Sequence, residues 1–247
     1  MKLNPLAYGL TYKTMEHDHD LVVFREDLIK IAARLLDKAH MLRFDEANGV
    51  FSPTDLGRTA SHYYIKYDTI EMTNTRLKEI MTDKEIFGLV SECHEFTQIK
   101  SRDEEMEELD LLHESCVLPV MGGSENSSGK VNILIQSYVS RSRVDGFSLV
   151  SDTSYINQNA PRIVRAIFEI VIKRGWAIMA GRLLNVCKSL EKQLWHFQSP
   201  MRQFESQLGY EIINKIEHKN LTLEKLRDMS AQVLKNFFLL KFAFPNQ

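Results

Sequence analysis

The loop at residues 119–136, PVMGGSENSSGKVNILIQ, carries the residue types of a phosphate-binding loop. Such a loop requires the spacing G-x-x-x-x-G-K-[ST], because its backbone N–H groups surround the phosphates and the final hydroxyl binds Mg²⁺. Here five residues separate Gly123 from Gly129, and Lys130 is followed by Val131. The spacing and the missing hydroxyl argue against nucleotide binding. The pattern instead favours a polar loop that ends at the start of a helix, capped by a serine of the pair before Gly129.

Three other groups of reactive side chains lack the spacing that chemistry requires. The segment Glu16–Asp20, EHDHD, mixes histidine and carboxylates, but consecutive loop residues rarely converge on one metal ion. His62 lies beside two tyrosines, where a buried or interface histidine is expected more often than a catalytic one. Cys93, Cys116 and Cys187 form no C-x-x-C pair and are expected to be reduced thiols. These residues predict no catalytic site, no metal site and no cofactor bound by this chain.

Length and composition allow one large domain or two to three small ones, since the 247 residues are 44% hydrophobic and 26% charged. No apolar run reaches the ~18 residues that cross a bilayer. The net charge of −2 conceals an asymmetry: residues 1–150 carry 17 Lys/Arg against 25 Asp/Glu, and residues 151–247 carry 14 against 8. The basic second part indicates either a surface for a polyanion or an attraction between the two parts.

The elements that would position any site are mostly helical. Apolar residues repeat at helical spacing over 22–40, and the Asn48-Gly49 turn that follows predicts a hairpin. A helix followed by a two-stranded ribbon is typical of the end of a winged helix. Further helices are expected at 54–66, 69–80, 83–94, 102–115, 128–141, 155–174, 176–195, 209–218 and 222–240, the last broken near Met229. The acidic segment at 101–116 predicts a solvated helix face, with an apolar face formed by Met106, Leu109, Leu111 and Leu112.

One predicted helix differs from the others. In NAPRIVRAIFEIVIKRGW, which begins at Asn159, apolar residues surround most of the circumference, so the helix is expected to be buried. Its polar residues form one narrow stripe, continued one turn back by Gln158 and Asn159: Arg162, Arg165, Glu169 and Lys173. Pro161 is expected in the first turn or at a kink. Either the stripe meets solvent, with Glu169 pairing the neighbouring cations, or its arginines meet a phosphate backbone.

Several stretches together resemble one family: NPLAYGL, FSPTDLGRTASHYYIKYDTIE, EEMEELD, NAPRIVRAIFEIVIKRGW and SPMRQF. They are similar to the region after the motor core in the large superkiller-type helicases with Sec-sixty-three homology units. The phrase LGR-x-ASHYYI, at Leu56–Ile65, carries the resemblance most specifically, and the similarity runs from about residue 4 to about residue 228.

The resemblance implies a mainly α architecture in three parts. Residues 1–55 would be the C-terminal part of a winged helix, and residues 56–198 a helical bundle with a long ratchet helix. Residues 199–247 would be a helix-loop-helix unit with an irregular end, where FFLLKFAF could leave an apolar patch exposed. The immunoglobulin-like β-sandwich that usually follows in the family is expected to be missing.

The resemblance also assigns the stripe to nucleic acid. In the family the ratchet helix crosses beneath two RecA-like motor domains and touches the translocating strand. Asn159, Arg162 and Arg165 fall on that helix, Lys173 continues the stripe, and Arg202 is a further candidate contact. Glu205 departs from the basic residue that relatives tend to carry, which weakens a phosphate contact there. Both arginines of the ratchet helix are expected to be exposed.

The implied function is the non-catalytic, nucleic-acid-guiding region of an ATP-dependent 3′–5′ helicase. ATP and Mg²⁺ would belong to motor domains outside this chain. The implied partners are those motor domains, single-stranded DNA or RNA and other subunits of the helicase's complex, in nucleus and cytoplasm and without a membrane. The alternative is a protein-interaction scaffold that binds partner subunits and no nucleic acid. The membrane-anchored namesake of the homology unit carries a J-domain with a His-Pro-Asp tripeptide, which this sequence lacks.

Overall fold

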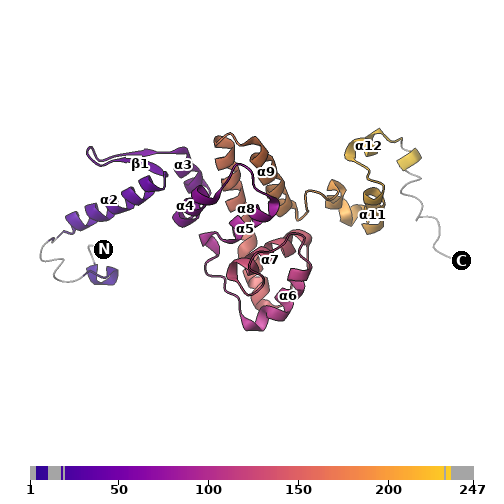
Figure 1. Ribbon diagram of the computed structural model, residues 1–247, viewed down its shortest axis with the longest axis horizontal. Helices are drawn as coiled ribbons and strands as arrows, with labels where there is room; N and C mark the ends of the chain where they lie inside the picture. The colour runs from indigo at the N-terminus through magenta and orange to yellow at the C-terminus, as the bar shows by residue number, and fades with distance from the viewer. Residues whose placement is uncertain (1–3, 11–17, 19, 231, 235–247) are drawn as a thin grey trace.

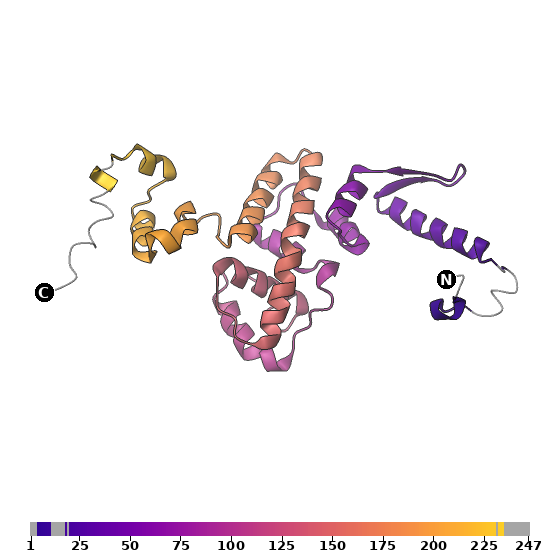
Figure 2. The same cartoon turned by 180° about the vertical axis from the view of Figure 1, so that it is seen from behind.

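The computed structural model describes residues 4–10, 18, 20–230 and 232–234, and these residues are mainly α-helical. Three parts follow one another along the long axis, as Figures 1 and 2 show from opposite sides. A helix and a hairpin lie at one end, a helical bundle occupies the centre, and a small helical unit lies at the other end. The prediction of a mainly α fold is confirmed.

The N-terminal part contains the 3₁₀ turn η1 (Pro5–Tyr8), the helix α2 (Val22–Lys38) and a hairpin. Strands β1 (Leu42–Asp45) and β2 (Val50–Pro53) pair antiparallel, with Leu42 opposite Pro53 and Asp45 opposite Val50. The turn places Gly49 at φ +66°, a conformation that glycine adopts without strain. The predicted helix and hairpin are confirmed, whereas the assignment of residues 1–55 to a winged helix stays a prediction.

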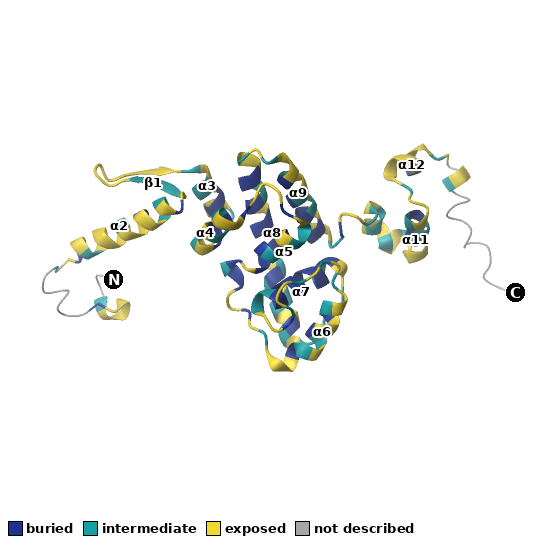
Figure 3. Ribbon diagram, in the orientation of Figure 1, coloured by how far each residue is buried: buried dark blue, intermediate teal, exposed yellow. Residues whose placement is uncertain are grey.

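The bundle consists of short helices around one long one. Its elements are α3 (Asp55–His62), α4 (Tyr67–Arg76), α5 (Asp83–Ser91), η2 (His94–Phe96), η3 (Asp103–Glu105), α6 (Met106–Glu114), α7 (Ser127–Ser140), α8 (Phe147–Lys173) and α9 (Ala177–Lys192). Helix α8 runs through the middle and packs against α3, α7 and α9 (Figure 1). Figure 3 shows that the buried residues concentrate on α7, α8 and α9, so the core of the molecule surrounds α8.

Helix α8 is longer than its apolar pattern predicted. It begins at Phe147, eight residues before the predicted start, and places Pro161 in its interior. Of the two expected positions of the proline, the first turn is therefore wrong, and a kink stays a prediction. The helix tolerates Pro161 because the φ of proline suits a helix and one ladder hydrogen bond is lost, the one to the carbonyl of Asn157. Ile172, expected inside, is 52% exposed.

Helix α7 begins where the sequence predicted, with a different cap. The side chain of Asn126 accepts a hydrogen bond from the N–H of Ser128 at 3.0 Å, so asparagine caps the helix in place of serine. A Cβ on Gly129 would lie 1.8 Å from the carbonyl oxygen of Gly123. The glycines of this loop therefore allow two backbone segments to meet.

Three sequence expectations about burial are wrong. Leu111 is 64% exposed, because the apolar face of α6 is formed by Leu109 and Leu112 alone at full burial. His62 lies at the exposed end of α3 and is not a core residue. Glu105, expected on a solvated acidic face, is buried against the side chain of a lysine from α7.

The third part contains η4 (Pro200–Phe204), α10 (Glu205–Leu208), α11 (Tyr210–His218) and α12 (Leu223–Asp228). The helical pattern stops at Met229, which confirms the predicted break. Trp195 attaches the connecting segment to the bundle: it is buried, stacks 5.5 Å from Phe87, and donates from Nε1 to Oγ of Ser140 at 2.9 Å. The apolar stretch FFLLKFAF lies outside the described residues.

Candidate nucleic-acid interface

The polar stripe of α8 lies between α3 and α9. Steps of three, four and four residues at ~100° per residue keep Arg162, Arg165, Glu169 and Lys173 on one side of the helix. The partners of these side chains come from both flanking helices, as the individual contacts below show. The stripe therefore lies along the contact of α8 with α3 and α9, and it is partly exposed to solvent.

Arg162 closes the C-terminal end of α3. Its Nη1 donates to the carbonyl oxygens of Tyr63 and Tyr64 at 2.8 and 2.5 Å, and its Nε and Nη2 donate to Oδ1 of Asn159 at 3.1 and 2.6 Å. Asn159, 8% exposed, is fixed in turn by a bond from Nδ2 to the carbonyl of Tyr155 at 2.8 Å. A cation at the carbonyl end of a helix is stabilised by the helix dipole. Arg162 is half-buried and engaged, so the expectation of a freely exposed arginine is wrong at this position.

Arg165 pairs across to α9. Its Nη2 lies 2.8 Å from Oε2 of Glu191, and the two side chains are 50% and 51% exposed. In one of the two alternatives drawn from the sequence, the solvent-facing stripe, Glu169 was the expected partner of Arg165. That prediction is wrong because Glu169 accepts from Lys173 at 2.8 Å and from Oγ1 of Thr59 at 3.2 Å. The hydrogen bond from Lys173 lowers the pKa of Glu169 below its ordinary value.

Lys173 bridges α8 and α3, since its Nζ also donates to Oγ1 of Thr59 at 2.8 Å. The predicted pair of Glu169 with Lys173 is confirmed. Beside it, burial raises the pKa of Tyr63, and the negative charge of Glu169 adds to that shift.

Arg202 lies in η4, in the third part of the molecule, whereas the stripe lies on α8 in the bundle. Its guanidinium forms a bidentate pair with Glu217 at 2.6 and 2.7 Å, which raises the pKa of Arg202 and lowers that of Glu217. Glu205, which follows, lies 3.7 Å from Arg141 at the end of α7. The structure therefore separates Arg202 from the other four predicted contacts.

A paired cation of the stripe can bind a phosphate only after it leaves the carboxylate with which it pairs in this structure. An ion pair between exposed side chains contributes ~0–1 kcal/mol, so a phosphate can displace Glu191 from Arg165 at low cost. Arg162 differs, because its contacts in the described part of the chain are oxygens without net charge, and its positive charge stays uncompensated. Arg162 is therefore the uncompensated cation of the stripe within the described residues, and Arg165 is a cation held only by an exposed ion pair.

Comparison with known proteins identifies the family to which the part of the chain with this stripe belongs. The family model of the Sec63 Brl domain matches residues 53–246. The chain belongs to the Sec63 Brl domain family. It is 54% identical over 93% of its length to "Activating signal cointegrator 1 complex subunit 3" of Bos taurus, 47% over 94% to "DExH-box ATP-dependent RNA helicase DExH14" of Arabidopsis thaliana, and 40% over 93% to "U5 small nuclear ribonucleoprotein 200 kDa helicase" of Homo sapiens.

The resemblance expected from the sequence is confirmed by these matches. The chain spans about a tenth of the length of these relatives, 10% or 11% in each case. All five predicted contacts and the whole of α8 fall within the matched Sec63 Brl residues, whereas α2 and β1 precede them.

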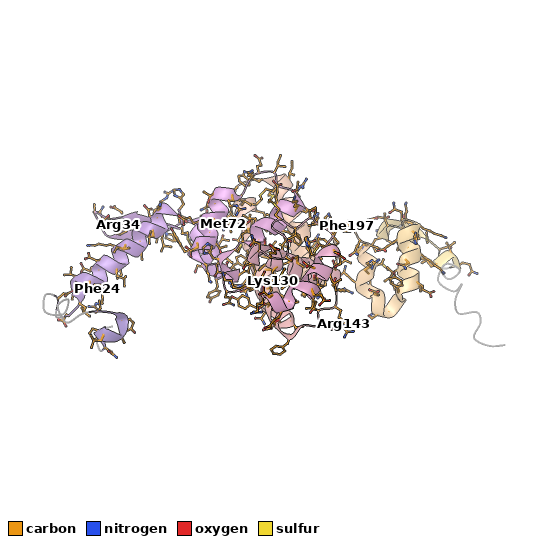
Figure 4. All side chains as sticks on the ribbon, turned by 60° about the horizontal axis from the view of Figure 1, so that its bottom comes forward. Phe24, Arg34, Met72, Lys130, Arg143 and Phe197 are labelled. Carbon is orange, nitrogen blue, oxygen red and sulfur yellow. The ribbon has the colours of Figure 1, made fainter. Side chains whose placement is uncertain are left out.

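The Sec63 Brl bundle also contains a charged cluster that sequence reasoning missed. The ammonium group of Lys130, fully buried at the centre of Figure 4, donates to the carbonyl of Lys100 at 3.0 Å, to Asp152 at 2.7 Å and to Glu105. Arg102 covers the two carboxylates from the surface. The glycine-lysine pair of the loop could have indicated this cluster. Its lysine, Lys130, binds carboxylates of the same chain, whereas the lysine of a phosphate-binding loop binds phosphates.

A second missed cation lies at the end of α8. The Nη2 of Arg174 donates to Oδ1 of Asn74 at 2.6 Å, and the guanidinium lies 5.0 Å from the ring centre of Trp176. Burial lowers the pKa of Arg174. Like Arg162, it joins the two parts of the sequence through an uncharged oxygen atom, so the expected charge attraction between the parts stays a prediction. Within the described residues no group of histidine, cysteine and carboxylate side chains could hold a metal ion, and no helix has the length and hydropathy to cross a bilayer.

Proposed function

We propose that this Sec63 Brl chain forms the non-catalytic, nucleic-acid-guiding region of an ATP-dependent 3′–5′ helicase of the activating signal cointegrator complex. The observation that carries the proposal is the exposed cation of α8, Arg165, in a chain 40–54% identical to proteins named as helicases or as that complex's subunit. ATP and Mg²⁺ are bound by RecA-like motor domains outside this chain.

The action of the stripe follows from its charge. A single strand passing along α8 places a phosphate at Arg165, which releases Glu191, and meets the uncompensated charge of Arg162 beside it. Phosphate contacts carry no sequence information, so the strand can slide while the motor domains move it. Asn159 orients Arg162, and Lys173 extends the positive side of the stripe. Arg202 reaches a strand only after it leaves Glu217.

The biological setting is proposed from the family resemblance. The proposed partners are the motor domains of the same helicase, single-stranded DNA or RNA and the other subunits of the cointegrator complex. The proposed roles are DNA alkylation repair, ribosome quality control and transcription coactivation, in nucleus and cytoplasm.

A second candidate function is a scaffold that binds partner subunits and no nucleic acid. One observation favours it: each predicted contact residue already has a partner within the chain. Exposed apolar side chains on α2, including Val23, Ile29 and Ile31, offer a surface for a protein.

Binding of labelled single-stranded oligonucleotides, followed by fluorescence anisotropy at several salt concentrations, separates the two candidates. We expect binding that is independent of base sequence, and Arg165→Ala to flatten the slope of log K against log salt by about 0.7. Arg143→Ala is the matched control, because Arg143 is an exposed arginine paired with Asp145 at 2.7 Å outside the stripe. Absence of binding would favour the scaffold, and equal slopes for the two variants would exclude Arg165 as a contact.

A further inference from the structure

The turn after α3 holds an aromatic ring in solvent. Tyr64 follows the end of the helix with φ +53°, and the N–H of Ile65 donates back to the carbonyl of Ala60 at 2.9 Å. This six-to-one bond with a left-handed residue is the arrangement that ends many helices, and glycine is its usual residue. Burial of the ring does not offset the strain of this conformation, because Tyr64 is 85% exposed.

Backbone conformation alone does not distinguish Tyr64. Other segments of this chain also end on left-handed residues that are not glycine, among them His40, Arg141 and Gln193. The distinguishing feature is the pair of hydrogen bonds that Arg162 donates to the backbone of the Tyr64 turn. The Nη1 of Arg162 donates to the carbonyl of Tyr64 at 2.5 Å and to that of Tyr63 at 2.8 Å, which fixes the turn to α8 from below.

Two cations belong to the turn or contact its backbone. Arg162 donates to the backbone carbonyl of Tyr64 in the turn, and Lys66, exposed two residues later, donates from Nζ to the carbonyl of His94 at 2.9 Å. Neither cation pairs with a carboxylate among the described residues. Three carboxylates near the turn have other partners: Glu95 is buried and accepts from the N–H of Lys66 and from Thr69, Asp68 lies 3.6 Å from Nδ1 of His94, and Glu169 pairs with Lys173. An aromatic face beside uncompensated cations is the combination that binds single-stranded nucleic acid, since bases stack on the ring and phosphates meet the cations.

We propose that Tyr64 is a stacking platform for one base of the single strand, and that Arg162 is its positioning residue. The inference rests on the proposed function and adds a base contact to a stripe that otherwise meets phosphates only. It also gives Arg162 a second role beside the phosphate contact expected from the sequence. Stacking tolerates every base, because each presents a flat π-face, so the platform grips the strand without selecting a sequence.

Two variants of Tyr64 keep the test independent of folding. Tyr64→Gly removes the ring at a position where glycine suits the backbone, so we expect an unchanged or higher melting temperature. Tyr64→Phe keeps the ring. Phe147→Ala is the matched control: Phe147 is 91% exposed at the start of α8, roughly 20 Å along the helix from Arg162.

The measurement compares an intact oligothymidylate with one of equal length that carries abasic sites. For the intact strand we expect Tyr64→Gly to weaken binding by about 5- to 150-fold, and Tyr64→Phe and Phe147→Ala to bind like the parent chain. For the abasic strand we expect the parent chain and Tyr64→Gly to bind equally, because the charges remain. A 2-aminopurine base in the strand should lose fluorescence on binding the parent chain and keep it with Tyr64→Gly.

The outcomes separate this inference from the proposed function. Binding of the intact strand by Tyr64→Gly with the affinity of the parent chain overturns the inference and leaves the proposed function standing; the exposed ring then serves a protein partner. Equal weakening on intact and abasic strands also overturns stacking, because the loss would then be one of charge or shape. Absence of binding by every variant overturns both.

Discussion

Removing the buried ammonium group of Lys130 should destabilise the bundle by about 3 kcal/mol. Lys130 is fully buried, and the side chains of its partners Glu105 and Asp152 are 3% and 16% exposed. Lys130→Met keeps the length of the chain and leaves two carboxylates without their central cation. Breaking a buried ion pair from one side costs ~3–5 kcal/mol, and Arg102, which still reaches both carboxylates, brings the value to the lower end.

Urea unfolding followed by tryptophan fluorescence measures this loss, because the ring of Trp195 is buried in the bundle. The double variant Lys130→Met with Glu105→Gln serves as the control. Since it removes both charges together, we expect it to be more stable than the sum of the single losses predicts, by at least about 1 kcal/mol. A loss below about 1 kcal/mol for Lys130→Met, or strictly additive losses, would refute the argument that a buried charge network stabilises α7 against η3 and α8.

Three further outcomes follow from the structure. Burial alone would raise the pKa of Glu105, but the hydrogen bonds that its carboxylate accepts outweigh burial, so the pKa lies below 4.5. The stability that the ionised carboxylate contributes is therefore complete above about pH 4.5 and is lost as the pH falls further. We expect Glu105→Gln to flatten the dependence of the unfolding free energy on pH in that acidic range. Gly129→Ala should lower the free energy of unfolding by about 3 kcal/mol, because the new Cβ would meet a backbone oxygen. Gly181→Ala, which has open space around it, should cause no loss. Equal melting temperatures of the two variants would contradict this. Burial raises the pKa of Cys116 and Cys187 to about 11, so iodoacetamide near neutral pH should alkylate these thiols quickly only in denaturant, as mass spectrometry can measure.

Local patterns predicted most of the elements. The Asn48-Gly49 turn predicted the hairpin because its residues favour a tight turn, and apolar periodicity located most helices within a few residues. The first eight residues of α8, FSLVSDTS, were missed because serine, threonine and aspartate there resemble a helix cap. Tertiary packing stabilises this segment as helix, with Leu149 fully buried.

The candidate site was predicted only as a set of polar residues, most of them cations. Their period identified one face of α8, but their partners are distant in sequence: Glu191 lies 26 residues from Arg165, and the carbonyl of Tyr63 lies 99 residues from Arg162. Contacts of this kind depend on how the helices cross, which periodicity does not contain. Lys130 was missed for a related reason, because burial of a lysine requires carboxylates that only the folded chain brings together.

The proline inside α8 has a mechanical consequence. A helix of 27 residues is about 40 Å long and resists bending wherever its hydrogen-bond ladder is continuous. Pro161 interrupts that ladder at the carbonyl of Asn157, so a load along α8 bends it within this one turn. The helix then behaves as two stiff rods joined by a compliant turn. Arg162, Arg165 and Lys173 all lie on the second rod, so bending tilts the cations together and preserves the distances between them.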